Sequence, residues 1–183
     1  MADVDQFAVV TGTVPSSGTF SITHSDITTW STKGVCVLVL SGTKTDDASL
    51  DDMAMSIGVI DHNGNCACFG AGMVDNFGGQ QARHYYSSNT SDHPGISIDN
   101  LTEACKLGFS SAGTGGPTLS VDVTTETGWV YKAFLFATSG SGDAVAFSHG
   151  SGNYTGAGSE MDLYILGMGN GTDDTISSTA RMS

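Results

Sequence analysis

The chain has 183 residues and a formal net charge of -13, because 19 acidic residues face only 6 lysines and arginines. This length suits one domain with a full hydrophobic core. Nucleic-acid binding requires clustered basic residues, which are missing here, and no apolar run approaches the roughly 18 residues of a membrane span. We therefore expect one acidic domain that binds neither nucleic acid nor a membrane.

Short apolar segments separated by turn residues recur along the whole chain. Glycine is abundant, with 25 residues, and helix-favouring residues are few. This pattern predicts an all-β fold, an antiparallel β-sandwich of the jelly-roll or concanavalin-like type with little or no helix. The expected strands are Phe7–Val10, Thr19–Ile22, Val35–Leu40, Met53–Ile60, Cys66–Val74, Gly95–Ile98, Ala104–Phe109, Thr118–Val123, Trp129–Thr138, Ala144–Phe147 and Asp162–Gly167.

Two of these segments carry more specific information. Val35–Leu40 is apolar at every position, which indicates a central strand buried on both faces. The sequence Asp61-His-Asn-Gly-Asn65 joins two apolar runs, and its Asn-Gly pair favours a tight hairpin. The same residues resemble the opening of a calcium loop, although Gly72 stands where the bidentate acid would be. The stretch Thr45–Met55 is expected to be an acidic loop.

The four cysteines are Cys36, Cys66, Cys68 and Cys105. The first residues lack the features of a secretion signal, so we expect synthesis in a cytoplasm and reduced, buried thiols. A zinc site that combines Cys66 and Cys68 with His62 and His84 is the alternative, but a second closely spaced cysteine pair is lacking. We expect no metal and no cofactor.

The sequence nominates no catalytic residues. The histidines, His24, His62, His84, His93 and His149, all lie in segments typical of turns or strand ends, and no nucleophile elbow, zinc-protease motif or phosphate loop occurs. The prediction is therefore a protein that is not an enzyme.

Arg83-His84-Tyr85-Tyr86 is the densest group of interface-type side chains in the chain. Arginine and tyrosine offer large contact areas at a low cost in conformational entropy. These four residues are candidates for contact with a protein or a glycan. The alternative is that the tyrosine rings cover an edge of the sandwich and Arg83 pairs with a local carboxylate.

Several stretches occur in an order that resembles a known family. They are Met55–Asn65, Gly72-Met-Val-Asp-Asn-Phe77, Arg83, Ala104, Thr118-Leu-Ser-Val121 and the closing strand Tyr131–Gly140. Together they resemble tailed-phage and prophage virion-associated proteins with concanavalin-like β-sandwich repeats, over roughly Val9 to Gly140. Ile60 and the absence of Asp-Gly before Thr118 depart from the family pattern. The resemblance implies that Asp75, Asn76 and Arg83 form a structural network.

The resemblance also implies a function. The expected role is a bacteriophage virion structural protein, specifically a capsid decoration or surface protein made in the host bacterial cytoplasm. Its partners would be the major capsid protein or tail proteins, together with further copies of itself in a homo-oligomer. The alternative is a tail- or fibre-associated module that binds a host surface glycan, which would need Tyr85, Tyr86, Trp30 or Trp129 in an open groove.

Residues 1–140 are expected to form the β-sandwich, and residues 141–183 to supply strands that complete or extend it within the same domain. Val37–Asp47 parallels Tyr164–Asp174, either by chance or because the C-terminal part begins a partial second repeat. Half a sandwich would leave an apolar face and open edges exposed. We therefore expect Tyr164 to be buried against the first sandwich or against a neighbouring subunit.

Overall fold

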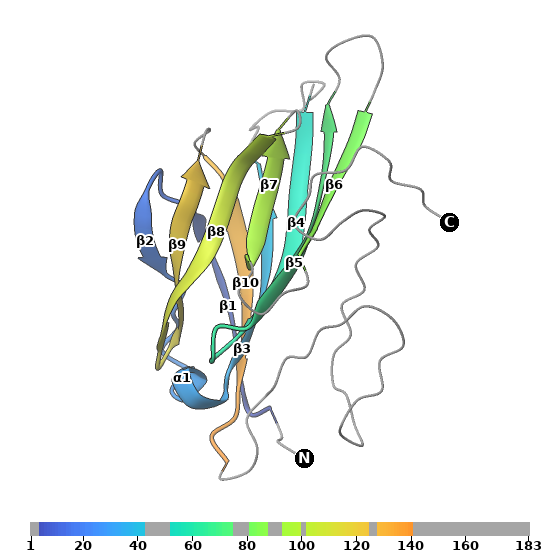
Figure 1. Ribbon diagram of the computed structural model, residues 1–183. Coiled ribbons are helices and arrows are strands. Elements are labelled where there is room, and N and C mark those ends of the chain that lie inside the picture. The colour runs from blue at the N-terminus through green and yellow to red at the C-terminus, as the bar shows by residue number, and fades with distance from the viewer. Residues whose placement is uncertain are drawn as a thin grey trace, which may run out of the picture.

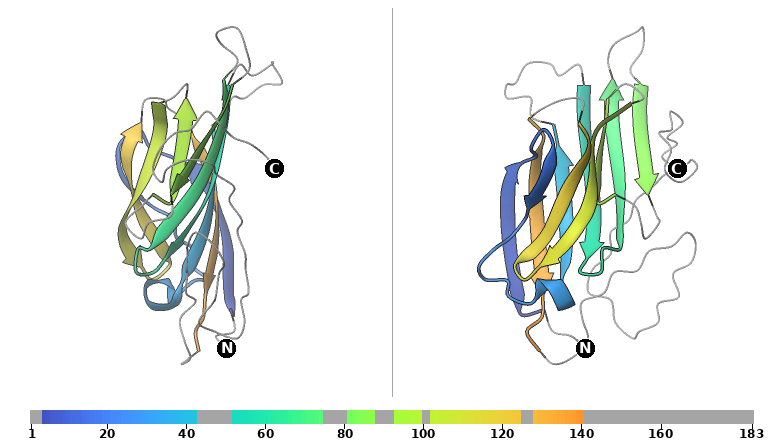
Figure 2. Two further views of the ribbon diagram at one scale, coloured as in Figure 1. Left: turned by 45° about the vertical axis from the view of Figure 1, so that its right-hand side comes forward. Right: turned by 60° about the vertical axis from the view of Figure 1, so that its left-hand side comes forward.

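A computed structural model describes residues 4–42, 52–74, 81–87, 93–99, 102–124 and 128–140. These residues form two antiparallel sheets, one of six strands and one of four (Figure 1). Figure 2 shows the sheets as two facing layers. The predicted all-β, sandwich-like fold with little helix is thus confirmed. The segments predicted as strands at Ala144–Phe147 and Asp162–Gly167 lie outside the described residues.

The six-stranded sheet has the order β1-β10-β3-β4-β5-β6. All of its neighbouring strands pair in antiparallel orientation. Its strands are β1 (Gln6–Thr13), β3 (Val35–Ser41), β4 (Asp52–Asp61), β5 (Cys66–Val74), β6 (Gln81–Ser87) and β10 (Val130–Ala137).

The four-stranded sheet has the order β2-β9-β8-β7 and covers one face of the larger sheet. Its strand pairs are also antiparallel, with irregular register in the β7–β8 and β8–β9 pairs. The strands are β2 (Gly18–Ser21), β7 (Gly95–Asp99), β8 (Thr102–Gly113) and β9 (Gly116–Thr124).

The core lies between the sheets and follows the two-residue period of the strands. Leu38 and Leu40 of β3 and Leu135 of β10 are fully buried from one side, and Leu107 and Leu119 from the other. Alternation places every second residue of a strand on the same face, so these positions meet across the layer gap. The predicted burial of Val35–Leu40 as a central strand is confirmed, because β3 is an inner strand and, of these six residues, only Val39 is half-buried.

The two sheets approach each other closely beside β7. Gly58 of β4 has no side chain, and a Cβ there would overlap the carbonyl oxygen of Pro94. The buried hydroxyl of Ser56 accepts a hydrogen bond from the backbone N–H of Ile96 at 3.3 Å. A glycine and a serine in an otherwise apolar strand therefore let β7 lie against β4, and a larger side chain at position 58 would force the layers apart.

The structure contains two elements that the sequence did not predict, and it shortens the predicted acidic loop. Gln81–Ser87 forms strand β6, although its sequence does not alternate between apolar and polar residues. Trp30–Lys33 forms the short helix α1, whose Trp30 side chain is wholly buried in the core. β4 begins at Asp52, inside the range expected to be an acidic loop. In each case pairing or burial supplied by distant segments outweighs the weak local preference.

Candidate interaction surface

The outward face of the six-stranded sheet is mostly apolar across five strands. Strand pairing aligns its residues in rows, because side chains directly opposite each other in an antiparallel pair point to the same face. One row runs Val9, Phe134, Val37, Val59, Ala67; the next runs Thr11, Lys132, Val39, Ile57, Phe69; a third runs Thr13, Val130, Ser41, Met55, Ala71; and Phe7, Phe136 and Val35 flank the first, in a row that ends at the buried Asp61. We call these residues the apolar face.

The apolar face has a packed centre and exposed margins. Val35, Val37 and Val59 are buried and form a cluster of their own with Ile57, Phe134 and Phe136. At the margins Phe7, Val9 and Met55 remain 54%, 40% and 46% exposed. Scattered exposed apolar residues are normal on a protein surface, whereas a continuous patch of them marks an interaction site. This arrangement therefore identifies the face as a candidate binding surface.

Two aromatic contacts order the margin of the apolar face. The rings of Phe7 and Phe136 lie 5.2 Å apart at 41°. The Lys132 ammonium lies 5.9 Å from the centre of the Phe134 ring, within the range of a cation–π contact. Such contacts restrict the rotamers of the large side chains, so that less entropy is lost when a partner covers them.

The outward face of the four-stranded sheet is polar. Ser21 and Thr118, which are register partners on β2 and β9, share a hydrogen bond of 2.8 Å between their hydroxyls. Further along β9 the Ser120 hydroxyl donates to the Asp122 carboxylate at 2.6 Å. The described side chains named here are hydroxyls and a carboxylate, and none of them is apolar. The two outward faces thus differ in chemistry.

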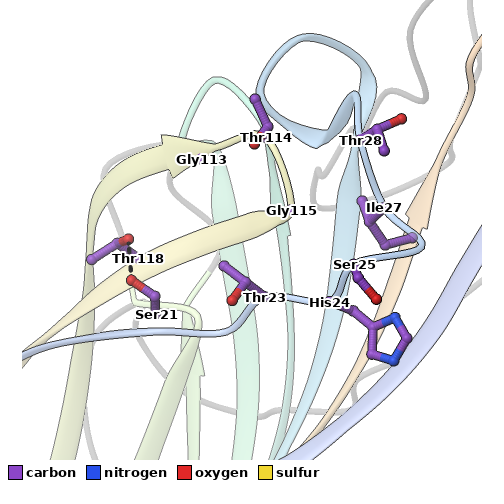
Figure 3. Close-up of a pocket in the computed structure, with 10 residues that line it drawn as sticks. All are labelled: Ser21, Thr23, His24, Ser25, Ile27, Thr28, Gly113, Thr114, Gly115 and Thr118. Atoms are coloured by element: carbon purple, nitrogen blue, oxygen red, sulfur yellow. Dashed lines mark hydrogen bonds between the residues drawn. The ribbon is translucent and has the colours of Figure 1, made fainter.

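An open hollow lies at one end of the polar face, between the β8–β9 turn and the segment after β2 (Figure 3). Its volume is about 650 Å³. Most of its lining is hydroxyl groups and glycine backbone: Ser21, Thr23, His24, Ser25, Ile27, Thr28, Gly113, Thr114, Gly115 and Thr118. Figure 3 shows the imidazole of His24 directed away from the Ser21–Thr118 pair. Its described lining offers hydrogen-bonding groups but no tryptophan, tyrosine or phenylalanine ring on which a sugar could stack.

Two histidine and aspartate pairs occur on the same side. His24 Nδ1 lies 3.7 Å from an Asp26 carboxylate oxygen and accepts a hydrogen bond from the Asp26 backbone N–H at 3.2 Å. His93 Nδ1 lies 2.9 Å from the Leu107 carbonyl oxygen and 3.5 Å from Asp122 Oδ2.

Neither pair activates a nucleophile. Such activation requires a hydroxyl bonded to the imidazole, with the carboxylate on the far side of the ring. Here the Ser120 hydroxyl donates to the carboxylate itself. The groups of each pair instead hold one another and the backbone in place. That the protein is not an enzyme stays a prediction.

The structure describes some of the interface residues that were predicted from the sequence and not others. Arg83, His84, Tyr85 and Tyr86 lie on β6, opposite Gly72, Ala71, Gly70 and Phe69 of β5. Asp75, Asn76 and Tyr164 lie outside the described residues, so the structural network of Asp75, Asn76 and Arg83 stays a prediction. Trp30 and Trp129 are buried in the core, and neither lines an open groove as glycan binding would require.

The hairpin predicted at Asp61–Asn65 is confirmed. β4 and β5 pair on either side of it, and Gly64 has a φ of 86°, which favours glycine. Asp61 Oδ1 accepts from the backbone N–H groups of Asn63 and Asn65, both at 2.9 Å, and Oδ2 accepts from the Asn65 amide at 2.8 Å. Both carboxylate oxygens are therefore engaged inside the turn.

All four cysteines are buried thiols. Burial raises the pKa of the Cys36 thiol well above its usual range and raises the pKa of Cys105 to about 12. Within the described ranges no group of three or more histidine, cysteine, aspartate or glutamate side chains is placed to hold a metal ion. The described helices include none with the length and apolar character of a membrane span.

The apolar face was not predicted from the sequence, although a signal for it was present. Phe7–Val10 and Val130–Ala137 are almost continuously apolar, as Val35–Leu40 is. In a two-layer sandwich a strand that is apolar at consecutive positions must present apolar side chains outward.

Comparisons with protein-family models, with curated proteins and with solved structures found no match for this chain.

Proposed function

We propose that this protein is a bacteriophage virion structural protein, a decoration or surface protein of the capsid that acts through protein–protein contacts. The observation that carries the proposal is the apolar face, with Phe7, Val9 and Met55 exposed at its margins. A protein that works by assembly needs a surface of this kind, and it needs no pocket with an activated nucleophile.

Composition and sequence pattern support the same role. The net charge of -13 disfavours phosphate binding and keeps a glycine-rich surface soluble at the high local concentration of a particle surface. The ordered stretches from Met55 to Gly140 resemble virion-associated β-sandwich proteins, and the two-sheet fold agrees with that resemblance. The major capsid protein or tail proteins are the proposed partners, and the virion is the proposed location.

The experiment is mass spectrometry of virions purified from the phage that encodes the chain, with copy number measured against the major capsid protein. Hundreds of copies in each particle would support a decoration protein of the shell. A handful of copies would place the protein on the tail and overturn the capsid assignment. Absence from virions that still contain their other structural proteins would overturn the proposal as a whole.

A glycan-binding role on the tail or a fibre is the second candidate, and the hollow beside Ser21 and Thr118 favours it. Its hydroxyls could hydrogen-bond a sugar, but no tryptophan, tyrosine or phenylalanine is among its described lining residues. This role can be tested by NMR: the chemical shifts of Thr23, Thr114 and Thr118 are followed while a host surface oligosaccharide is added. Shifts confined to the hollow, and weakened by Thr118→Val, would support it, whereas unchanged spectra at millimolar sugar would exclude it.

A further inference from the structure

Among the described residues, the apolar face is where a copy of this acidic chain would meet the fewest acidic side chains. Across β1, β10, β3, β4 and β5 its three full rows contain no carboxylate, and the Lys132 ammonium is their one charged group. The row of Phe7, Phe136 and Val35 ends at Asp61, whose carboxylate is buried and engaged inside the β4–β5 turn. Two chains of net charge -13 repel each other over most of their surfaces. Contact between copies costs least where acidic side chains are fewest, which is this face.

The size of the face is slightly below that of a standard interface. Five strands spaced about 4.8 Å apart, each contributing about seven residues at about 3.3 Å, span roughly 550 Å². Standard specific interfaces bury about 600 to 1,000 Å² on each partner, so the face lies slightly below the lower limit of this range. An area of this size fits a weak, reversible dimer rather than an obligate one.

The shape of the face also suits a second sheet. Its centre, formed by Val35, Val37 and Val59, is buried, and the more exposed residues lie beside it: Phe7 and Val9 on β1 and Met55 on β4. Two sheets that meet face to face interdigitate such side chains at a spacing of about 10 Å. Residues at the margin of one copy would then close over the margin of the other and exclude water from the centre.

We infer that the apolar face binds a second copy of this chain, so that two six-stranded sheets pack face to face in a homodimer. The inference rests on the proposed function, since it names the first partner of the same surface. The dimer would expose the two polar faces, with their hydroxyls and Asp122, on its outside. Because the contact is apolar, the dimer should persist when salt rises from about 0.05 M to about 0.5 M.

The first test measures the mass of the full chain in solution by sedimentation equilibrium from about 1 to 200 μM, in low and high salt. Val9→Asp adds a charge at an exposed position of the apolar face, and Thr19→Asp adds the same charge at an exposed position of β2 on the polar side. We expect wild type and Thr19→Asp to dimerise alike, and Val9→Asp to weaken dimerisation at least tenfold. A monomeric wild type, or equal dimerisation by all three proteins, would overturn the inference.

The second test identifies the occupant even if Val9→Asp fails to fold. The photo-crosslinking amino acid p-benzoylphenylalanine replaces Phe7 in the full chain, and a matched protein carries it at Thr19. We expect light to produce a covalent dimer only from position 7, joined to peptides of β1, β10, β3 or β4 of the other copy. Crosslinks within one chain to residues 141–183 would mean that the C-terminal segment covers the face, and the inference would then be wrong. No crosslink from position 7 would also contradict it.

The two proposals can fail separately. If virions contain hundreds of copies but the purified protein neither dimerises nor crosslinks between copies, the virion role stands and the homodimer does not. If the protein dimerises through the apolar face but is absent from virions, the interface stands and the proposed function falls. The salt series adds an independent check, because dissociation at about 0.5 M would indicate a contact dominated by charge.

Discussion

On the outward side of the six-stranded sheet, Val9, Phe134 and Val37 stand in one row, whereas on the outward side of the four-stranded sheet Thr19 and Ser120 stand opposite each other. The inward sides of both sheets are alike, with Cys36, Leu38, Leu107 and Leu119 all buried in the same core. Burial between the layers demands apolar residues on both inward faces. No such demand acts on an outward face, so the difference between the two points to what each must contact.

The difference should be largest when the same charge is placed on each outward face. Val37→Asp puts a carboxylate in the packed centre of the apolar face, and we expect a loss of about 2 to 3 kcal/mol in the free energy of unfolding. Thr19→Asp on the polar side should change it by less than about 0.5 kcal/mol. Urea denaturation followed by tryptophan fluorescence, at a concentration below dimerisation, measures both. Equal losses would mean that the two faces do not differ in this way.

The likeness of the two inward faces can be tested through their thiols. The folded-state pKa values of Cys36 and Cys105 are raised, because burial disfavours the thiolate. Their contribution to stability is therefore complete below the unfolded-state pKa, near 8.5, and is lost as the pH rises from there toward the folded-state values. We expect the urea midpoint of the wild type to fall between about pH 7.5 and 10, and to fall less in Cys36→Ala and in Cys105→Ala.

If only one of the two substitutions reduced the fall of the urea midpoint, the other thiol would be less well shielded from water, and the two inward faces would differ. Labelling provides the control: the thiols should react slowly with an aromatic disulfide reagent in the folded protein, and all four should react after denaturation in urea. Added reductant should leave the melting temperature unchanged, because no disulfide joins these cysteines. Fast labelling of Cys36 or Cys105 in the folded protein would contradict their burial.

The smallest effect is expected at the border of the apolar face, where β10 ends beside β1. The Asp5 carboxylate accepts hydrogen bonds from the Ser139 hydroxyl and, at 2.8 Å, from the Ser139 backbone N–H, and these bonds lower the pKa of Asp5. Its contribution to stability is present above the unfolded-state pKa and is lost as the pH falls through the lower folded-state pKa. Asp5→Asn should therefore melt slightly below the wild type at pH 7, with the gap closing in acid below about pH 4. A gap that is independent of pH would exclude this ionic contribution.

Much of the fold could be predicted from local pattern, because a two-residue alternation or an apolar run constrains a strand wherever it lies. The strands at Val35–Ser41 and Cys66–Val74 and the hairpin at Asp61–Asn65 were readable for this reason. β6 and α1 were not. The sequence Gln81–Ser87 lacks alternation and becomes a strand by pairing with β5, and Trp30 is fixed by burial in a core assembled from distant segments.

By itself, the sequence determined the acidic character, the all-β class and the presence of several strands apolar at consecutive positions. Only the tertiary structure decided which of those apolar residues face the core and which face outward. A strand has two faces, and its sequence does not say which neighbours will cover each one. Val9, Phe134 and Val37 form one surface because β1, β10 and β3, far apart in the chain, pair side by side in register.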